Sequence, residues 1–190
     1  MKKIVFDIET KNSFAEVGNN ISGFEISVVG LYDSERDVYE SYFEQDFVNL
    51  WPILEQADML IGFNSNSFDI PILNKYYSGD LTKIKSLDIL QEIYQVMDKR
   101  TSLDSIAEAT LGVNKSGHGL QAIEWWKSQE LEKLKNYCLD DVKITKQIYD
   151  FTRENNFLLY TKQGEIRKVQ IDATNWEKKL ETKINLTLPI

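Results

Sequence analysis

The first ten residues of the chain show a clear alternation of apolar and polar positions. This alternation predicts a strand over residues 2–10 with one apolar face and one face that carries both Asp7 and Glu9. The apolar positions are Ile4, Phe6 and Ile8 on one face and Val5 on the other. Apolar residues on both faces are typical of a central strand whose sheet is covered on both sides.

Beyond this strand, the apolar pattern predicts two further strands, a helix, a strand, a helix and then several more helices. The expected strands cover residues 25–32, 37–43, 59–61 and 83–87, and the expected helices cover residues 46–56, 68–76, 102–111 and 129–155, with another helix from residue 88. Pro52 is expected to kink or divide the first helix, Ser67 to cap the second and Gly112 to end the third. Residues 11–23 are expected to form a long polar loop, and residues 157–172 a hairpin.

The helix predicted over residues 129–155 has a well-defined inward face. Its inward positions, three or four residues apart, are Leu134, Tyr137, Asp141, Ile144 and Ile148. The same spacing places Asp140 on the polar outer face, so it separates two adjacent aspartates. Tyr137 lies one turn before Asp141 on the same side. Taken alone, Tyr137 fits an ordinary core aromatic as well as a functional phenol.

Carboxylates recur on predicted buried elements at three places in the chain. Asp7 and Glu9 share one face of a strand, Asp69 lies in the first turn of a helix, and Asp141 faces inward. Each has a simpler explanation, such as a polar strand end or a favourable charge at a helix N-terminus. However, ionised carboxylates are costly to bury unless they are paired or bind a metal, and these motifs contain no basic partner. Their coincidence predicts a divalent-metal site.

The three stretches together resemble the exonuclease motifs of the DEDD superfamily, which are ribonuclease-H-like 3′→5′ exonucleases. The order is Asp-x-Glu from Asp7, then Asn-x-x-x-Phe-Asp ending at Asp69, then Tyr-x-x-x-Asp from Tyr137. The tyrosine is typical of the DEDDy branch, which includes the proofreading domain of family B DNA polymerases. The resemblance implies an α/β fold with a mixed β-sheet flanked by helices. It covers residues 1–155, and residues 156–190 are expected to form a C-terminal hairpin and tail that pack on this domain or on a partner.

The resemblance also implies a mechanism with two metal ions. Asp7 would bridge both ions, Glu9 and Asp141 would hold the water-activating ion, and Asp69 would mainly hold the other. Tyr137 would orient the attacking water. Oxygen-rich ligands favour Mg²⁺ or Mn²⁺ over zinc.

The implied activity is metal-dependent removal of nucleoside 5′-monophosphates from the 3′ end of single-stranded or frayed nucleic acid. Thr10 and Asn64 stand beside the first two motifs and are candidates for contacts to the terminal nucleotide. The residues leave DNA and RNA open, because recognition of the 2′-hydroxyl cannot be derived from them.

The net charge of −8 is the main argument against a nucleic-acid substrate, because phosphate binding normally requires a basic surface. Two divalent ions would offset half of that charge. We therefore expect the chain to bind a single-stranded DNA or RNA 3′ end weakly, or with help from a polymerase or helicase partner. The chain has one cysteine and no apolar run long enough to span a membrane, so a soluble cytoplasmic protein is expected.

Two other functions fit the same residues. The chain could be a non-catalytic adaptor that keeps the fold in order to bind a nucleic acid or a partner. It could also be the nuclease module of a larger helicase or polymerase assembly. Retention of all four carboxylates and Tyr137 argues against the adaptor, because a module freed from catalysis does not need them.

Overall fold

The computed structural model describes residues 1–18, 20–113 and 119–178. Its centre is a five-stranded mixed sheet in the order β3-β2-β1-β4-β5. The strands are β1 Lys3–Thr10, β2 Ile26–Asp33, β3 Val38–Tyr42, β4 Met59–Gly62 and β5 Ser86–Asp88. β1 pairs antiparallel with β2 and parallel with β4, so it occupies the central position that its sequence predicts.

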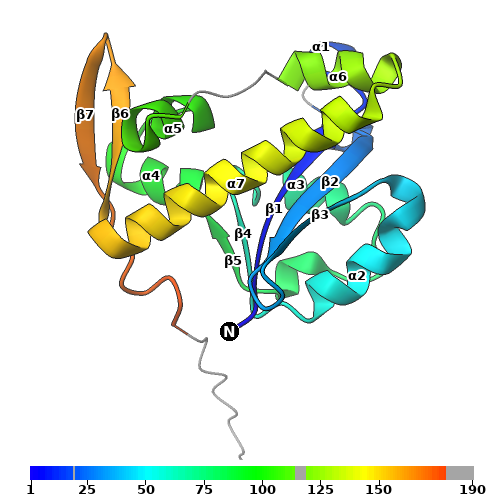
Figure 1. Cartoon of the computed structure of the whole chain (residues 1–190), viewed down its shortest axis with the longest axis horizontal. Coiled ribbons are helices and arrows are strands. Elements are labelled where there is room, and N and C mark those ends of the chain that lie inside the picture. The colour runs from blue at the N-terminus through cyan, green and yellow to red at the C-terminus, as the bar shows by residue number, and fades with distance from the viewer. Residues whose placement is uncertain (19, 114–118, 179–190) are drawn as a thin grey trace, which may run out of the picture.

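Helices cover both faces of the sheet, which makes the fold α/β as expected (Figure 1). They are α1 Phe14–Val17, α2 Phe47–Glu55, α3 Asp69–Leu73, α4 Ile89–Met97, α5 Leu103–Leu111, α6 Gly119–Lys127 and α7 Leu131–Asn155, with 3₁₀ turns at Ile21–Gly23, Glu44–Asp46 and Leu81–Lys83. None of the helices in the described ranges is both long and apolar enough to cross a membrane.

The alternating faces of β1 pack into two separate cores. Ile4, Phe6 and Ile8 join residues of α2 and α3 on one side of the sheet. On the other side, Val5 packs in a core built by α4, α5, α7 and the C-terminal hairpin. A strand that is buried on both faces leaves few positions for polar side chains, and β1 places Asp7 and Glu9 toward its C-terminal end.

The long helix α7 crosses the sheet in front of β1 and β2 (Figure 1). Its close approach depends on Gly30 of β2, which pairs with Asp7 of β1. A Cβ atom at Gly30 would lie 2.8 Å from Sγ of Cys138 on α7. The missing side chain therefore lets the helix approach the strand at the level of Asp7.

The predicted hairpin is confirmed as β6 Phe157–Lys162 and β7 Glu165–Gln170. It packs beside α5, where the Leu159 N–H donates a 2.9 Å hydrogen bond to Oγ1 of Thr110. After β7, the ring of Trp176 stacks on Tyr149 of α7 with centroids 5.8 Å apart. Residues 156–178 therefore pack on the rest of the chain, whereas the expected tail over residues 179–190 lies outside the described residues.

Three local expectations differ from the structure. Pro52 lies inside α2 and does not divide it, which excludes one of the two outcomes expected at this position. Ser67 does not cap α3: the N–H groups of Ser67 and Phe68 both donate to the Asn64 carbonyl, and this turn delays the helix to Asp69.

The expected loop over residues 11–23 contains α1 and a 3₁₀ turn. Its short helix starts with a capping box in which Ser13 and Glu16 satisfy each other's hydrogen bonds. The segment is therefore partly regular, and it places the ring of Phe14 against the ring of Phe24.

Candidate functional site

Three carboxylates from distant parts of the sequence converge at the C-terminal half of β1. Carboxylate oxygens of Asp7, Glu9 and Asp141 all lie within 4.8 Å of one another. Glu9 and Asp141 are buried and Asp7 is half-buried. The pairing of β1 with β2 shifts register between Glu9 and Thr10, an irregularity of the kind that redirects side chains next to functional sites. The three oxygens are close enough to share a cation.

Asp69 lies against the backbone of the same strand but is not a member of this group of three. Its side chain is buried in the first turn of α3, and Oδ1 accepts a 3.2 Å hydrogen bond from the N–H of Ile8, between Asp7 and Glu9. Burial raises the pKa of Asp69 to about 7, the charge of Asp88 adds to the rise, and hydrogen bonds from the backbone oppose it. Asp69 can therefore bind a proton near neutral pH, or a cation in its place.

The phase predicted for α7 is confirmed. Asp141 faces the sheet and is buried, whereas Asp140 faces solvent and forms a 2.9 Å ion pair with Lys143. Tyr137 is buried one turn before Asp141, and its ring packs edge to face on Trp125 of α6 with centroids 5.8 Å apart. The phenol thus belongs to the packed wall beside the carboxylates.

Cys138 adds a thiol to this wall. Its S–H donates to the backbone oxygen of Asp7 at 3.6 Å and lies 3.8 Å from Oδ2 of the same residue. Burial, together with the charges of Asp7, Glu9 and Asp141, raises the pKa of this thiol well above its usual value. A neutral thiol is a poor metal ligand, so the donor set of the site consists of carboxylate oxygens.

The two predicted substrate contacts, Thr10 and Asn64, line different cavities. Thr10 lines a cavity of about 670 Å³ next to Glu9. Asn64 has a left-handed backbone with φ 68°, donates its N–H to Oδ1 of Asp88 at 2.8 Å, and accepts a side-chain hydrogen bond from Arg100. The structure therefore does not bring these two residues together in one cavity.

Sequence reasoning missed an aromatic cluster on the wall of the cavity that Glu9 and Thr10 line. Phe24 packs edge to face against Phe14 and Phe68, with centroids 4.7 and 5.1 Å apart. These rings, with Leu120 and Ile123, make that cavity mostly apolar. The only local signal was Phe68 directly before Asp69, because Phe14 lies in the segment expected to be a loop and Phe24 between that loop and the next expected strand.

Comparison with known proteins agrees with this architecture. The family B DNA polymerase from the hyperthermophilic archaeon Pyrobaculum calidifontis superposes with a TM-score of 0.60 at 17% sequence identity, over 80% of this chain and 24% of the polymerase. The chain therefore spans about a quarter of that polymerase's length, and at this identity the likeness concerns the fold alone. No curated protein matches the sequence. A family model described as the RNase_H superfamily matches residues 4–153, which confirms the expected ribonuclease-H-like fold. The chain belongs to the RNase_H superfamily.

Proposed function

We propose that this protein is a metal-dependent 3′→5′ exonuclease that releases nucleoside 5′-monophosphates from single-stranded or frayed ends. The observation that carries the proposal is the convergence of Asp7, Glu9 and Asp141, whose carboxylate oxygens lie within 4.8 Å of one another. Membership of a nuclease superfamily supports hydrolysis of phosphodiester bonds. The direction of attack comes from the motif resemblance, and it is part of the proposal.

The residues of the site fit Mg²⁺ or Mn²⁺. Their donors are all oxygens, and the buried thiol of Cys138 stays neutral beside them. Asp7, Glu9 and Asp141 would hold one ion, and Asp69 would hold a second ion together with Asp7. When bound, two such ions supply positive charge to the attacked phosphate and to the leaving 3′ oxygen.

The protein residues would position the reactants around this charge. Tyr137 lies one helical turn from Asp141, so its hydroxyl is suited to hold a water molecule by a hydrogen bond. A phenol is a weak base at neutral pH, and orientation of the water is therefore its role in the proposal. The packing of the Tyr137 ring on Trp125 would restrict the directions that this hydroxyl can take.

The apolar cavity beside Glu9 and Thr10 would hold the terminal nucleotide. Its volume of about 670 Å³ lies within the range of small-molecule sites, and the rings of Phe14 and Phe68 on its wall offer flat surfaces to a base. Thr10 stands where β1 meets this cavity and would contact the sugar. Asn64 lines a separate hollow and would contact the strand further from its end.

A simple assay tests the proposal. DNA and RNA single strands with a 5′ label are incubated with the protein and Mn²⁺, with and without chelator, and Asp7→Asn serves as the inactive control. We expect a ladder that shortens from the 3′ end only when metal is present. A parent protein that leaves every strand intact would favour the non-catalytic adaptor instead.

A further inference from the structure

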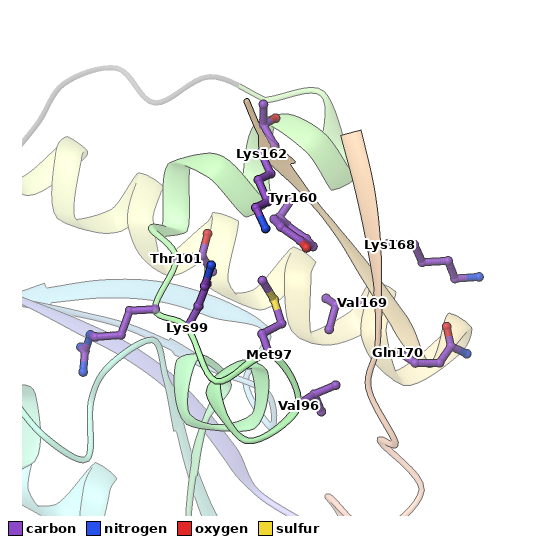
Figure 2. A pocket seen from close by; sticks show the side chains of 11 residues that line it. Val96, Met97, Lys99, Thr101, Tyr160, Lys162, Lys168, Val169 and Gln170 are labelled. Carbon is purple, nitrogen blue, oxygen red and sulfur yellow. The ribbon is translucent and has the colours of Figure 1, made fainter. Parts of the chain in front are cut away.

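A second cavity, of about 590 Å³, lies between the C-terminal end of α4 and the β6–β7 hairpin. Its floor is apolar and its rim is basic. The floor is formed by Met97, Tyr160 and Val169, and the rim includes Lys99, Arg100 and Lys162. Figure 2 shows the side chains of Lys99 and Lys162 reaching toward the same space, with the ring of Tyr160 beside them, whereas Lys168 points away from it.

The rim gathers three cationic side chains. Elsewhere, cationic side chains typically have carboxylate partners, as Lys3 has in Glu177 at 2.8 Å. By contrast, none of Lys99, Arg100 and Lys162 forms an ion pair with a carboxylate in the part of the chain that the structure describes. Like charges held together without counter-charges repel one another, and this repulsion is relieved when an anion binds. The rim therefore has the electrostatics of an anion site in a protein whose net charge is −8.

Arg100 connects this cavity to the segment that carries the second motif. It lines the 590 Å³ cavity and also a smaller hollow formed with Asn66 and Ser67, and it donates a hydrogen bond to Oδ1 of Asn64. The next residue after Ser67 is Phe68, which lines the apolar cavity beside Glu9. The hairpin cavity and the hollow at the second motif therefore share Arg100.

We infer that this basic cavity, hereafter the hairpin groove, binds the phosphate backbone of the substrate strand several nucleotides before its 3′ end. Lys99, Arg100 and Lys162 would contact phosphates, and the ring of Tyr160 would stack on a base, the combination that single-strand-binding surfaces use. The inference rests on the proposed exonuclease function for the direction of the strand. The groove gives an acidic protein a local group of three cations for a polyanion to contact.

Binding is measured by fluorescence anisotropy with the full chain, in chelator, on a labelled strand of about 16 nucleotides, the upper end of the usual site size. The test variant is Lys99→Glu/Lys162→Glu. The matched control is Lys83→Glu/Lys178→Glu, which makes the same charge change at two exposed lysines that do not line the groove. We expect the test variant to bind about tenfold more weakly, with a salt dependence that is shallower by about 1.4 in log–log slope for two lost phosphate contacts. Melting curves of both variants verify that they fold.

Equal weakening in both double variants would show a general charge effect and overturn the inference. Unchanged binding in a folded test variant would also overturn the inference. It would favour an acidic protein partner as the ligand of the groove.

Activity separates this inference from the proposed function. In Mn²⁺, an active parent should degrade a long strand faster than the test variant does, whereas both should cleave a dinucleotide, which is too short to reach the groove, at equal rates. Equal rates on the long strand would refute the role of the groove in substrate binding but would not contradict the exonuclease function. A parent that degrades nothing but binds in a groove-dependent manner would refute the exonuclease and keep the groove.

Discussion

The backbone N–H of Ile8 donates a 3.2 Å hydrogen bond to Oδ1 of Asp69, which joins two motifs that lie 61 positions apart. Ile8 is the residue between Asp7 and Glu9, so this contact fixes the first turn of α3 against the strand that carries the other acids. It also keeps Asp69 buried, and burial raises the pKa of this carboxyl to about 7. The ionised form of Asp69 is therefore unfavourable in the folded protein, and binding of a proton or a cation relieves this cost.

The first prediction is a pH dependence of stability in the metal-free protein. The pKa of Asp69 is about 7 in the folded chain and 3.8 without perturbation, so between these values the folded state binds more protons than the unfolded state. The contribution of Asp69 to stability must then fall as pH rises from about 4 to about 7, by up to about 4 kcal/mol. Asp69→Asn keeps an oxygen acceptor for the Ile8 N–H but does not titrate.

Urea unfolding in chelator checks this prediction. The parent and Asp69→Asn should have similar free energies of unfolding near pH 4.5. At pH 8, Asp69→Asn should be clearly more stable than the parent. If the difference in free energy of unfolding between parent and variant is constant across this pH range, Asp69 does not change its protonation there.

The second prediction concerns metal and stability. Because the clustered carboxylates bind a cation only in the folded state, millimolar Mg²⁺ or Mn²⁺ should raise the Tm, by the equivalent of about 2.7 kcal/mol when the metal is at a hundredfold excess over its Kd. Asp7→Asn should lose most of this gain. Asp140→Asn, whose side chain pairs with Lys143 at the surface, is the control and should keep it. Identical melting curves with and without metal in the parent would contradict the two-metal site.

The central strand and the phase of α7 could be predicted from the sequence because both follow from local periodicity. Alternation over residues 2–10 identified β1, and three-to-four spacing separated Asp141 from Asp140. A period of this kind depends only on residues that are close in the sequence, so it can be recognised without knowledge of the fold.

What the sequence did not reveal depends on contacts between distant segments. The hydrogen bond from Arg100 to Asn64 spans 36 positions, and Phe14, in a segment that is polar in composition, meets Phe68 from a distant part of the chain. The start of α3 was also misplaced, because the Asn64 turn overrides the capping preference of Ser67. Such features need tertiary geometry, which no local pattern encodes.

The third prediction separates the adjacent aspartates by function. Asp141→Asn removes one of the three converging carboxylates and should abolish nuclease activity, whereas Asp140→Asn should keep it near the parent level. Both substitutions are isosteric and lie on the same helix, so they differ only in the direction of the side chain. Rates on a labelled single strand with saturating Mn²⁺ measure the difference, and full activity in Asp141→Asn would exclude the carboxylate site as the catalytic centre.

The fourth prediction tests the approach of α7 to the sheet. In Gly30→Ala, the new methyl group would lie 2.8 Å from Sγ of Cys138, so overpacking should cost about 1–3 kcal/mol of stability. Cys138→Ala removes the sulfur and should restore much of the loss in the double variant. Denaturant unfolding of the parent, both single variants and the double variant measures this coupling directly. Additive losses would show that the sulfur is not the obstacle.

The last prediction concerns Tyr137 and the direction of attack. Tyr137→Phe keeps the ring that packs on Trp125 and all four carboxylates, but it removes the hydroxyl proposed to orient the attacking water. A positioned group of this kind is typically worth about 10²–10⁴-fold in rate. Turnover should therefore fall steeply, while the rise in Tm produced by Mn²⁺ should stay at the parent value.

Tyr149→Phe is the matched control, because it removes a buried hydroxyl from the same helix at a point where the partner is Glu177. This variant should lose some stability but keep its turnover, which would separate a loss of packing from a loss of catalysis. On a strand with a 5′ label, the products should shorten one nucleotide at a time, and a 3′-phosphate should slow their formation. Cutting of circular single strands would falsify the exonuclease assignment. Full activity in Tyr137→Phe would leave that assignment intact but remove the phenol from its mechanism, since the carboxylates alone would then account for the positioning of the water.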